Sequence, residues 1–162
     1  MDISQTFLKP VEKPAGLMMK LVYYLAKKQY GKVMTPLKVF GARMPVAFGK
    51  MGAKIYELDK KLTIPKELVF LIRNQVARIN VCEFCMDLGR YKAMKELMEA
   101  SKFDAINEYK TSPLFTESEK AALDYVTELT KEKKVNPQSF SRLATLYSER
   151  EICDIVYLVA SE

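Results

Sequence analysis

Two cysteines three residues apart carry the clearest chemistry in this sequence. Cys82 and Cys85 stand in the stretch Val-Cys-Glu-Phe-Cys-Met-Asp at 81–87, after a helical pattern over 67–80 and before a second that runs to about Ala100. The N-terminus of a helix carries partial positive charge and free N–H groups, which favour a thiolate over a thiol. This spacing therefore indicates a dithiol that can cycle with a disulfide.

The residues alone leave three interpretations of the pair open. In a redox dithiol the sulfurs must approach bonding distance, which requires Cα atoms within about 7 Å. A zinc site usually needs four Cys or His ligands, and the sequence offers just one more cysteine, Cys153, and no histidine. In an inert pair both thiols would be buried as small hydrophobes. Cys153 lies beside Ile152 and Val156, so we expect it in the core. We expect no metal and no other cofactor.

Length and composition predict one globular domain over residues 1–162. The chain is 49% hydrophobic and 28% charged, which is ordinary for such a domain. No apolar run approaches the roughly 20 residues that span a bilayer, and residues 1–16 do not resemble a signal peptide. We expect a cytoplasmic protein, where a Cys-x-x-Cys pair is more often redox-active or metal-binding than a structural bridge.

The net charge of +6 is unevenly distributed. Residues 1–66 hold 13 Lys and Arg against 4 Asp and Glu, a net charge of +9, whereas residues 67–162 hold 13 against 16, a net charge of −3. Such a basic half either forms a solvated lysine-rich face or favours an anionic partner. The sequence contains no nucleic-acid recognition motif, and we expect no nucleic-acid partner.

The periodicity of apolar residues predicts an all-α fold, because alternating strand patterns are rare in this chain. Helices are expected over 17–30, capped by Gly31, over 45–59, and from Pro65 towards the thiols. Further along the chain, two Ser/Thr-x-x-Glu capping boxes begin at Thr116 and Ser148, and Asn136-Pro137 marks another helix start.

The residues around the thiols resemble a known family. The stretch from Gln75 to Asp87, Gln-Val-Ala-Arg-Ile-Asn-Val-Cys-Glu-Phe-Cys-Met-Asp, resembles the signature of the alkylhydroperoxidase D / carboxymuconolactone decarboxylase family. Segments 30–45 and 114–125 resemble its flanking helices, so the resemblance covers about residues 30–162. It implies a helical bundle, a homo-oligomer such as a trimer or hexamer, and reduction of a peroxide substrate with electrons from a thiol reductant.

Two departures from the family pattern affect the expected activity. Redox members carry a histidine four residues after the second cysteine and a glutamate twelve residues before the first, where this chain has Gly89 and Phe70. Glu67, one helical turn before Phe70, is our candidate to replace the lost carboxylate, and Arg90 is a candidate to stabilise a thiolate.

We therefore predict a site formed by Cys82, Cys85 and Glu67, with slow or narrow peroxide reduction or with disulfide exchange. The alternative is a catalytically degenerate helical oligomer that serves as a binding or structural module. The decarboxylase branch of the family is a third option.

Overall fold

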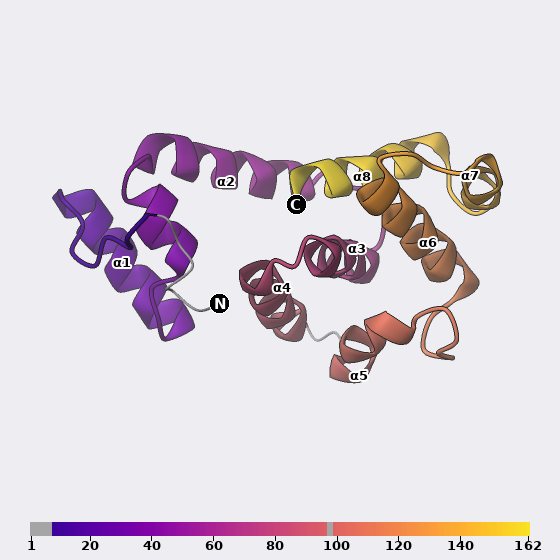
Figure 1. Ribbon diagram of the computed structural model, residues 1–162, viewed down its shortest axis with the longest axis horizontal. Coiled ribbons are helices and arrows are strands. Elements are labelled where there is room, and N and C mark those ends of the chain that lie inside the picture. Colours follow the sequence, from indigo (N-terminus) through magenta and orange to yellow (C-terminus); the bar gives the residue numbers. More distant parts are fainter. Residues whose placement is uncertain (1–7, 97–98) are drawn as a thin grey trace. The chain divides into compact units, whose positions relative to one another are not determined.

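The structure is a computed structural model that describes residues 8–96 and 99–162 (Figure 1). It separates into two compact units, Met1–Lys61 and Leu62–Glu162, and each is considered by itself. The described residues form helices joined by turns, with no strand among them, which confirms the all-α prediction. The expectation of a single domain stays a prediction. In the described part of the chain, no helix is both long enough and apolar enough to cross a membrane.

The N-terminal unit contains helix α1 (Leu17–Tyr30), a short π-helix η2 (Leu37–Gly41) and helix α2 (Pro45–Asp59). Gly31 ends α1 with φ 73°, a left-handed conformation that costs glycine little because it has no Cβ atom. Both helix ranges and this cap agree with the sequence predictions. A small core holds the unit together, and its buried members are Met19, Tyr23, Ala26 and Leu37.

Much of the apolar surface of this unit is exposed. Within α1, Met19, Tyr23 and Ala26 face the core, whereas Leu17 and Leu21 are 85% and 56% exposed. None of the residues of α2 is buried. Many apolar residues of α1 and α2 are therefore not buried in the core of their own unit.

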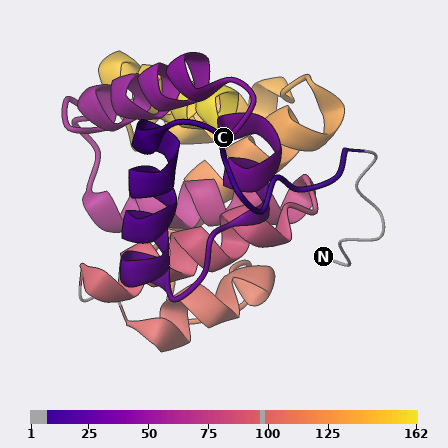
Figure 2. The same cartoon turned by 90° about the vertical axis from the view of Figure 1, so that its left-hand side faces the viewer.

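The C-terminal unit is built around α3 (Lys66–Ile79), which packs against α4, α6 and α8. In both views α8 and α5 lie on opposite sides of α3 (Figures 1 and 2). Helix α4 ends at Lys95, earlier than the expected end near Ala100. The remaining elements are α4 (Glu83–Lys95), α5 (Ala100–Asp104), a 3-10 helix η3 (Ala105–Glu108), α6 (Glu117–Glu132), α7 (Pro137–Ala144) and α8 (Glu149–Ser161).

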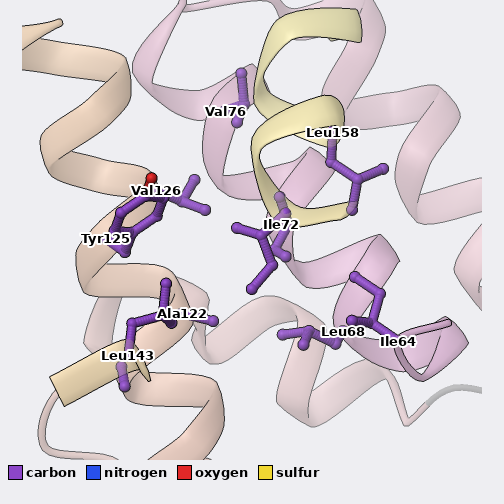
Figure 3. Close-up of a cluster of buried hydrophobic side chains, with 11 residues drawn as sticks. Ile64, Leu68, Ile72, Val76, Ala122, Tyr125, Val126, Leu143 and Leu158 are labelled. Carbon is purple, nitrogen blue, oxygen red and sulfur yellow. The ribbon is translucent and has the colours of Figure 1, made fainter. Parts of the chain in front are cut away.

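The core of this unit lies where one face of α3 meets α6, α7 and α8 (Figure 3). Leu68, Ile72 and Val76 recur at helical spacing, so they share one face of α3, and each is at most 2% exposed. Burying a side chain of this size stabilises the fold by about 1.5–3 kcal/mol. The opposing residues are Ala122, Tyr125, Val126, Leu143, Ile155 and Leu158.

Local hydrogen bonds fix the starts of the last three helices. The Thr116 and Ser148 side chains accept the N–H groups of Glu119 and Glu151, and those glutamates accept the cap N–H groups in return. The Asn136 side chain accepts the N–H of Gln138. Both capping boxes and the Asn136 cap are thus confirmed as the sequence predicts.

Asp154 connects the segment before α3 to α8. Its Oδ2 atom accepts the N–H and the hydroxyl of Thr63, each at 2.7 Å, and its Oδ1 atom pairs with Arg150 at 3.1 Å. The residue is only 3% exposed. A buried carboxylate needs such partners, because an unpaired buried charge is costly.

We expect Asp154→Ala to lower the free energy of unfolding by about 2–3 kcal/mol, because hydrogen bonds to a charged group contribute about 1.5–3 kcal/mol. Thr63→Val is the matched control. It keeps the backbone N–H bond and loses only the hydroxyl bond, so we expect a loss of about 1 kcal/mol. Urea unfolding followed by circular dichroism measures both, and equal losses in the two variants would contradict this account of the contact.

Candidate functional site

The structure joins Cys82 and Cys85 in a disulfide at the start of α4. Cys82 is the N-cap residue, and its Sγ atom accepts the N–H of Cys85 at 3.3 Å. The Cα atoms are 5.2 Å apart, and both cysteines are half-buried. The N-terminal turn of a helix thus holds two sulfurs within reach of each other and of small molecules from solvent. Among the described residues, no group of three or more His, Cys, Asp or Glu side chains could hold a metal ion.

A tight turn between α3 and α4 places the first cysteine. The N–H of Cys82 donates to the carbonyl of Ala77 at 2.8 Å, which folds the chain back onto the end of α3. Val81 takes up the reversal with φ 53°. A β-branched residue rarely adopts this left-handed conformation, and such backbone costs about 1–3 kcal/mol. The surrounding contacts therefore hold a strained residue next to the sulfur.

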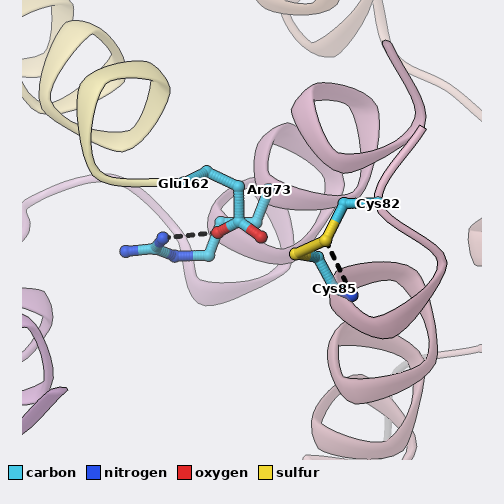
Figure 4. The surroundings of a disulfide bond; sticks show 4 residues. All are labelled: Arg73, Cys82, Cys85 and Glu162. Atoms are coloured by element: carbon cyan, nitrogen blue, oxygen red, sulfur yellow. Dashed lines mark hydrogen bonds and ion pairs between the residues drawn. A yellow bond between two sulfur atoms is a disulfide. The ribbon is translucent and has the colours of Figure 1, made fainter. Parts of the chain in front are cut away.

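A partly buried ion pair lies beside the disulfide (Figure 4). Arg73 of α3 donates to the Glu162 carboxylate at 2.7 Å, and the two side chains are only 16% and 15% exposed. Sequence reasoning missed both residues. Arg73 interrupts the apolar stretch of α3, which is a weak signal that it has a specific partner. Nothing in the sequence indicates that the partner is Glu162.

The structure does not bring Glu67 to the disulfide. Glu67 lies in the first turn of α3, and the cysteines follow the last turn, so the helical rise of 1.5 Å per residue separates them by roughly 18 Å. Lys66 beside it pairs at 3.1 Å with Glu96, just past the far end of α4. The expected replacement of the lost carboxylate by Glu67 stays a prediction. The distance of Glu67 from the cysteines does not favour it.

Glu67 takes part in a different network. Its carboxylate and that of Glu119 each lie 2.8 Å from the Lys102 ammonium. Burial by itself lowers the pKa of Lys102, but the hydrogen bonds to Glu119 and Glu67 outweigh this effect and raise its pKa above the ordinary value. These three charges stabilise the packing of α3 with α5 and α6.

A hollow of about 410 Å³ lies at the same end of α3. Glu67, Phe70 and Lys102 line it together with Lys66, Glu96, Glu99 and Leu114. Its lining contains neither cysteine. The hollow therefore does not form part of the disulfide site.

The two positions that depart from the family pattern lie at matching levels of the antiparallel α3–α4 pair. The chain doubles back so that Ala77 contacts Cys82 and Lys66 contacts Glu96. This antiparallel register places position 70 near position 89. A Cβ atom on Gly89 would meet only Phe103 Cζ, at 3.9 Å, which is ordinary van der Waals contact.

The expectation for Cys153 was wrong. Cys153 is exposed rather than part of the core, because consecutive residues of a helix point about 100° apart and Ile152 does not fix the face of its neighbour. Arg90, a candidate to stabilise the thiolate, pairs with Asp104, and its role towards the thiolate stays a prediction.

Known proteins share this fold. No family model matches the chain. YnjA of Escherichia coli K12, an uncharacterised protein, is 29% identical over 119 residues, which cover 73% of this chain and 64% of YnjA. The chain therefore spans less than two thirds of the length of this relative.

Two solved structures resemble the fold of this chain. The debrominase Bmp8, solved with 2,3,4-tribromopyrrole, has TM-score 0.79 and 21% identity over 99% of this chain and 86% of its own. ATU0492 of Agrobacterium tumefaciens, of unknown function and proposed to be the antioxidant defence protein AhpD, has TM-score 0.69 and 22% identity over 75% and 84%. The chain thus has the AhpD-like helical fold, as the resemblance implied.

Proposed function

We propose, with the AhpD-like fold as the premise, that this protein is a thiol-dependent redox protein that reduces peroxides with the Cys82/Cys85 couple. The observation that carries the proposal is the half-buried Cys82–Cys85 disulfide at the N-terminal turn of α4. A helix N-terminus favours the thiolate, the form that attacks peroxide oxygen. ATU0492, which has the same fold, is itself proposed to act in antioxidant defence.

The proposed reaction balances over two thiols. One cysteine thiolate attacks the O–O bond of a peroxide ROOH, which yields a sulfenic acid and, after protonation, ROH. The second thiol condenses with the sulfenic acid, which releases water and forms the Cys82–Cys85 disulfide. Two thiols have then given two electrons to one peroxide. A thiol reductant, as expected in the cytoplasm, returns the couple to its reduced form by disulfide exchange.

The absence of histidine limits the expected rate. A helix terminus contributes about 0.3–1 kcal/mol to the stability of a nearby anion, and up to about 2 kcal/mol when partly buried. A positioned general acid typically contributes 10²–10⁴-fold, and the residue at the family position is Gly89. We therefore propose slow peroxide reduction, with direct disulfide exchange as the related activity of the same site.

A stoichiometric titration tests the proposal. Reduced protein is mixed with hydrogen peroxide or cumene hydroperoxide, and thiols are counted over time while mass mapping locates any disulfide. We expect one peroxide consumed for two thiols lost, with the bridge between Cys82 and Cys85 and with Cys153 still reduced. Thiols that react neither with peroxides nor with a small disulfide such as oxidised glutathione would favour the alternative, a helical binding module.

We further propose that the protein forms a closed homo-oligomer, a trimer or hexamer, through the apolar surface of its N-terminal unit. Leu17, Leu21 and Leu25 recur along α1 at a spacing that places them on one exposed stripe. Exposed apolar stripes of this kind mark association surfaces, and most soluble oligomers are symmetric homo-oligomers.

We expect Leu21→Glu combined with Leu25→Glu to dissociate this oligomer at micromolar concentration, because burying two carboxylates at an apolar contact is strongly unfavourable. Light scattering coupled to size exclusion measures the mass. Lys20→Glu on the same helix is the control and should keep the wild-type mass. A wild-type protein that is monomeric at this concentration would refute the proposal.

A further inference from the structure

The charged groups next to the disulfide come from two elements far apart in the sequence. Arg73 lies on α3, four residues and one helical turn before Ala77, whose carbonyl accepts the N–H of Cys82. Glu162 follows the last residue of α8, which packs against α3. In the view of Figure 4, the Glu162 carboxylate lies between the Arg73 guanidinium and the disulfide.

Hydrogen bonds fix the positions of the Arg73 and Glu162 side chains, and little of either side chain contacts solvent. The guanidinium donates to the Glu162 carboxylate at 2.7 Å and also to the Ser161 hydroxyl at 3.4 Å. With exposed fractions of only 16% and 15%, both side chains have lost most of their water. A charge interacts more strongly with its neighbours in such surroundings than in solvent.

We propose that Glu162 is the proton-transfer group of the Cys82/Cys85 couple and that Arg73 is its positioning residue, an inference that rests on the proposed peroxide reduction. The carboxylate takes the thiol proton, which leaves a thiolate and a neutral carboxyl group. The thiolate attacks the peroxide ROOH and becomes a sulfenic acid, and the carboxyl group returns the proton to the leaving RO⁻ as ROH. Glu162 is then a carboxylate again.

Other charged groups near this end of the α3–α4 pair are less suited to the task. Glu83 and Asp87 are exposed on α4 and Glu162 as a whole residue is also exposed, but the Glu162 side chain is only 15% exposed. Arg78 of α3 donates to Asn107 at 3.2 Å. The Glu162 carboxylate, directly after α8, would supply the proton transfer that the family pattern assigns to a histidine, which this chain lacks.

Two measurements on Glu162→Gln and Arg73→Met test the roles separately. The first is the pH profile of iodoacetamide alkylation of the reduced thiols, with Cys153→Ser as the common background. Removing the negative charge of Glu162 should favour the thiolate and shift the profile to lower pH. Removing Arg73 leaves that charge uncompensated and should shift the profile to higher pH. If the ion pair had only a structural role, the alkylation profiles of the two variants would not shift in opposite directions.

The second measurement is the rate of peroxide-driven thiol loss. We expect Glu162→Gln to slow peroxide-driven thiol loss at least about tenfold, which is a modest share of the usual general acid–base contribution. This slower reaction should occur although the thiols of the variant are alkylated faster than those of wild type. Glu162→Asp and Arg73→Lys should recover part of the rate. Glu96→Gln, which breaks the Lys66–Glu96 pair at the far end of the same helices, is the control and should match wild type in both measurements.

The outcomes separate this inference from the proposed function. If peroxide does not oxidise the wild-type protein while the alkylation profiles shift in opposite directions, the ion pair acts on the thiols and the peroxidase proposal fails. If wild-type protein reduces peroxide and folded Glu162→Gln, checked by circular dichroism, keeps both the wild-type rate and the wild-type profile, the assignment of Glu162 is overturned. Glu162→Asp and Arg73→Lys decide the question should either larger change prevent folding.

Discussion

Replacing either Cys82 or Cys85 by serine is expected to reduce steady-state peroxide turnover by at least about 100-fold. Each turnover needs one thiol to attack and one to resolve the sulfenic acid. Both sulfurs belong to one helical turn, with Cα atoms 5.2 Å apart, and no nearby thiol can stand in. Serine is close in size to cysteine, and at position 82 its hydroxyl oxygen can cap α4 in place of the Cys82 sulfur, so the fold should survive.

The two variants should differ in the intermediate that they accumulate. The variant that retains the attacking cysteine forms a sulfenic acid that has no partner thiol, and dimedone traps it for mass spectrometry. The other variant should give little adduct after the same peroxide treatment. Cys153→Ser serves as the control and should turn over like wild type, because this residue lies on the exposed side of α8. Full turnover in both single variants would rule out the Cys82/Cys85 couple as the reactive centre.

Restoring the two residues of the family pattern is expected to have the second large effect. We predict that Phe70→Glu combined with Gly89→His accelerates peroxide-driven thiol loss by about 100-fold, the lower end of typical general acid–base contributions. The antiparallel register of α3 and α4 puts the two positions at the same level of neighbouring helices, and a Cβ atom at position 89 meets no close contact. Because the two groups would act as one relay, the double change should exceed the combined single changes.

The control is Phe70→Gln with Gly89→Asn, which has side chains of similar shape that cannot transfer a proton. Its rate should remain near that of wild type. The free energy of unfolding of both variants should be measured as well, because replacing a helical glycine changes helix propensity by up to about 1 kcal/mol and a bulkier side chain can disturb the packing. A folded Phe70→Glu, Gly89→His protein with an unchanged rate would indicate that the thiol pair is not peroxidatic and would favour disulfide exchange or the binding-module alternative.

Local signals made the helical framework predictable from the sequence. The capping boxes at Thr116 and Ser148 satisfy backbone N–H groups within four residues of the cap, so they act in the same way in almost any surroundings. Gly31 ends α1 for an equally local reason, since glycine accepts the left-handed conformation at no steric cost. The Cys-x-x-Cys spacing likewise suffices to place two sulfurs within one helical turn.

Tertiary packing decided which charges accompany the thiols. Arg73 and Glu162 are 89 residues apart in the sequence and meet because α8 packs on α3. Glu67 is closer to the cysteines in the sequence than Glu162 is, but it pairs with Lys102 at the other end of α3. A carboxylate pairs with whichever cation the fold brings within a few ångströms, and the separation of two residues in the sequence does not predict which cation this is. By itself, the sequence determined a helical protein with a thiol pair at a helix start. Only the tertiary structure decided that a partly buried Arg–Glu pair stands beside those thiols, because helix packing alone brings the two chain segments together.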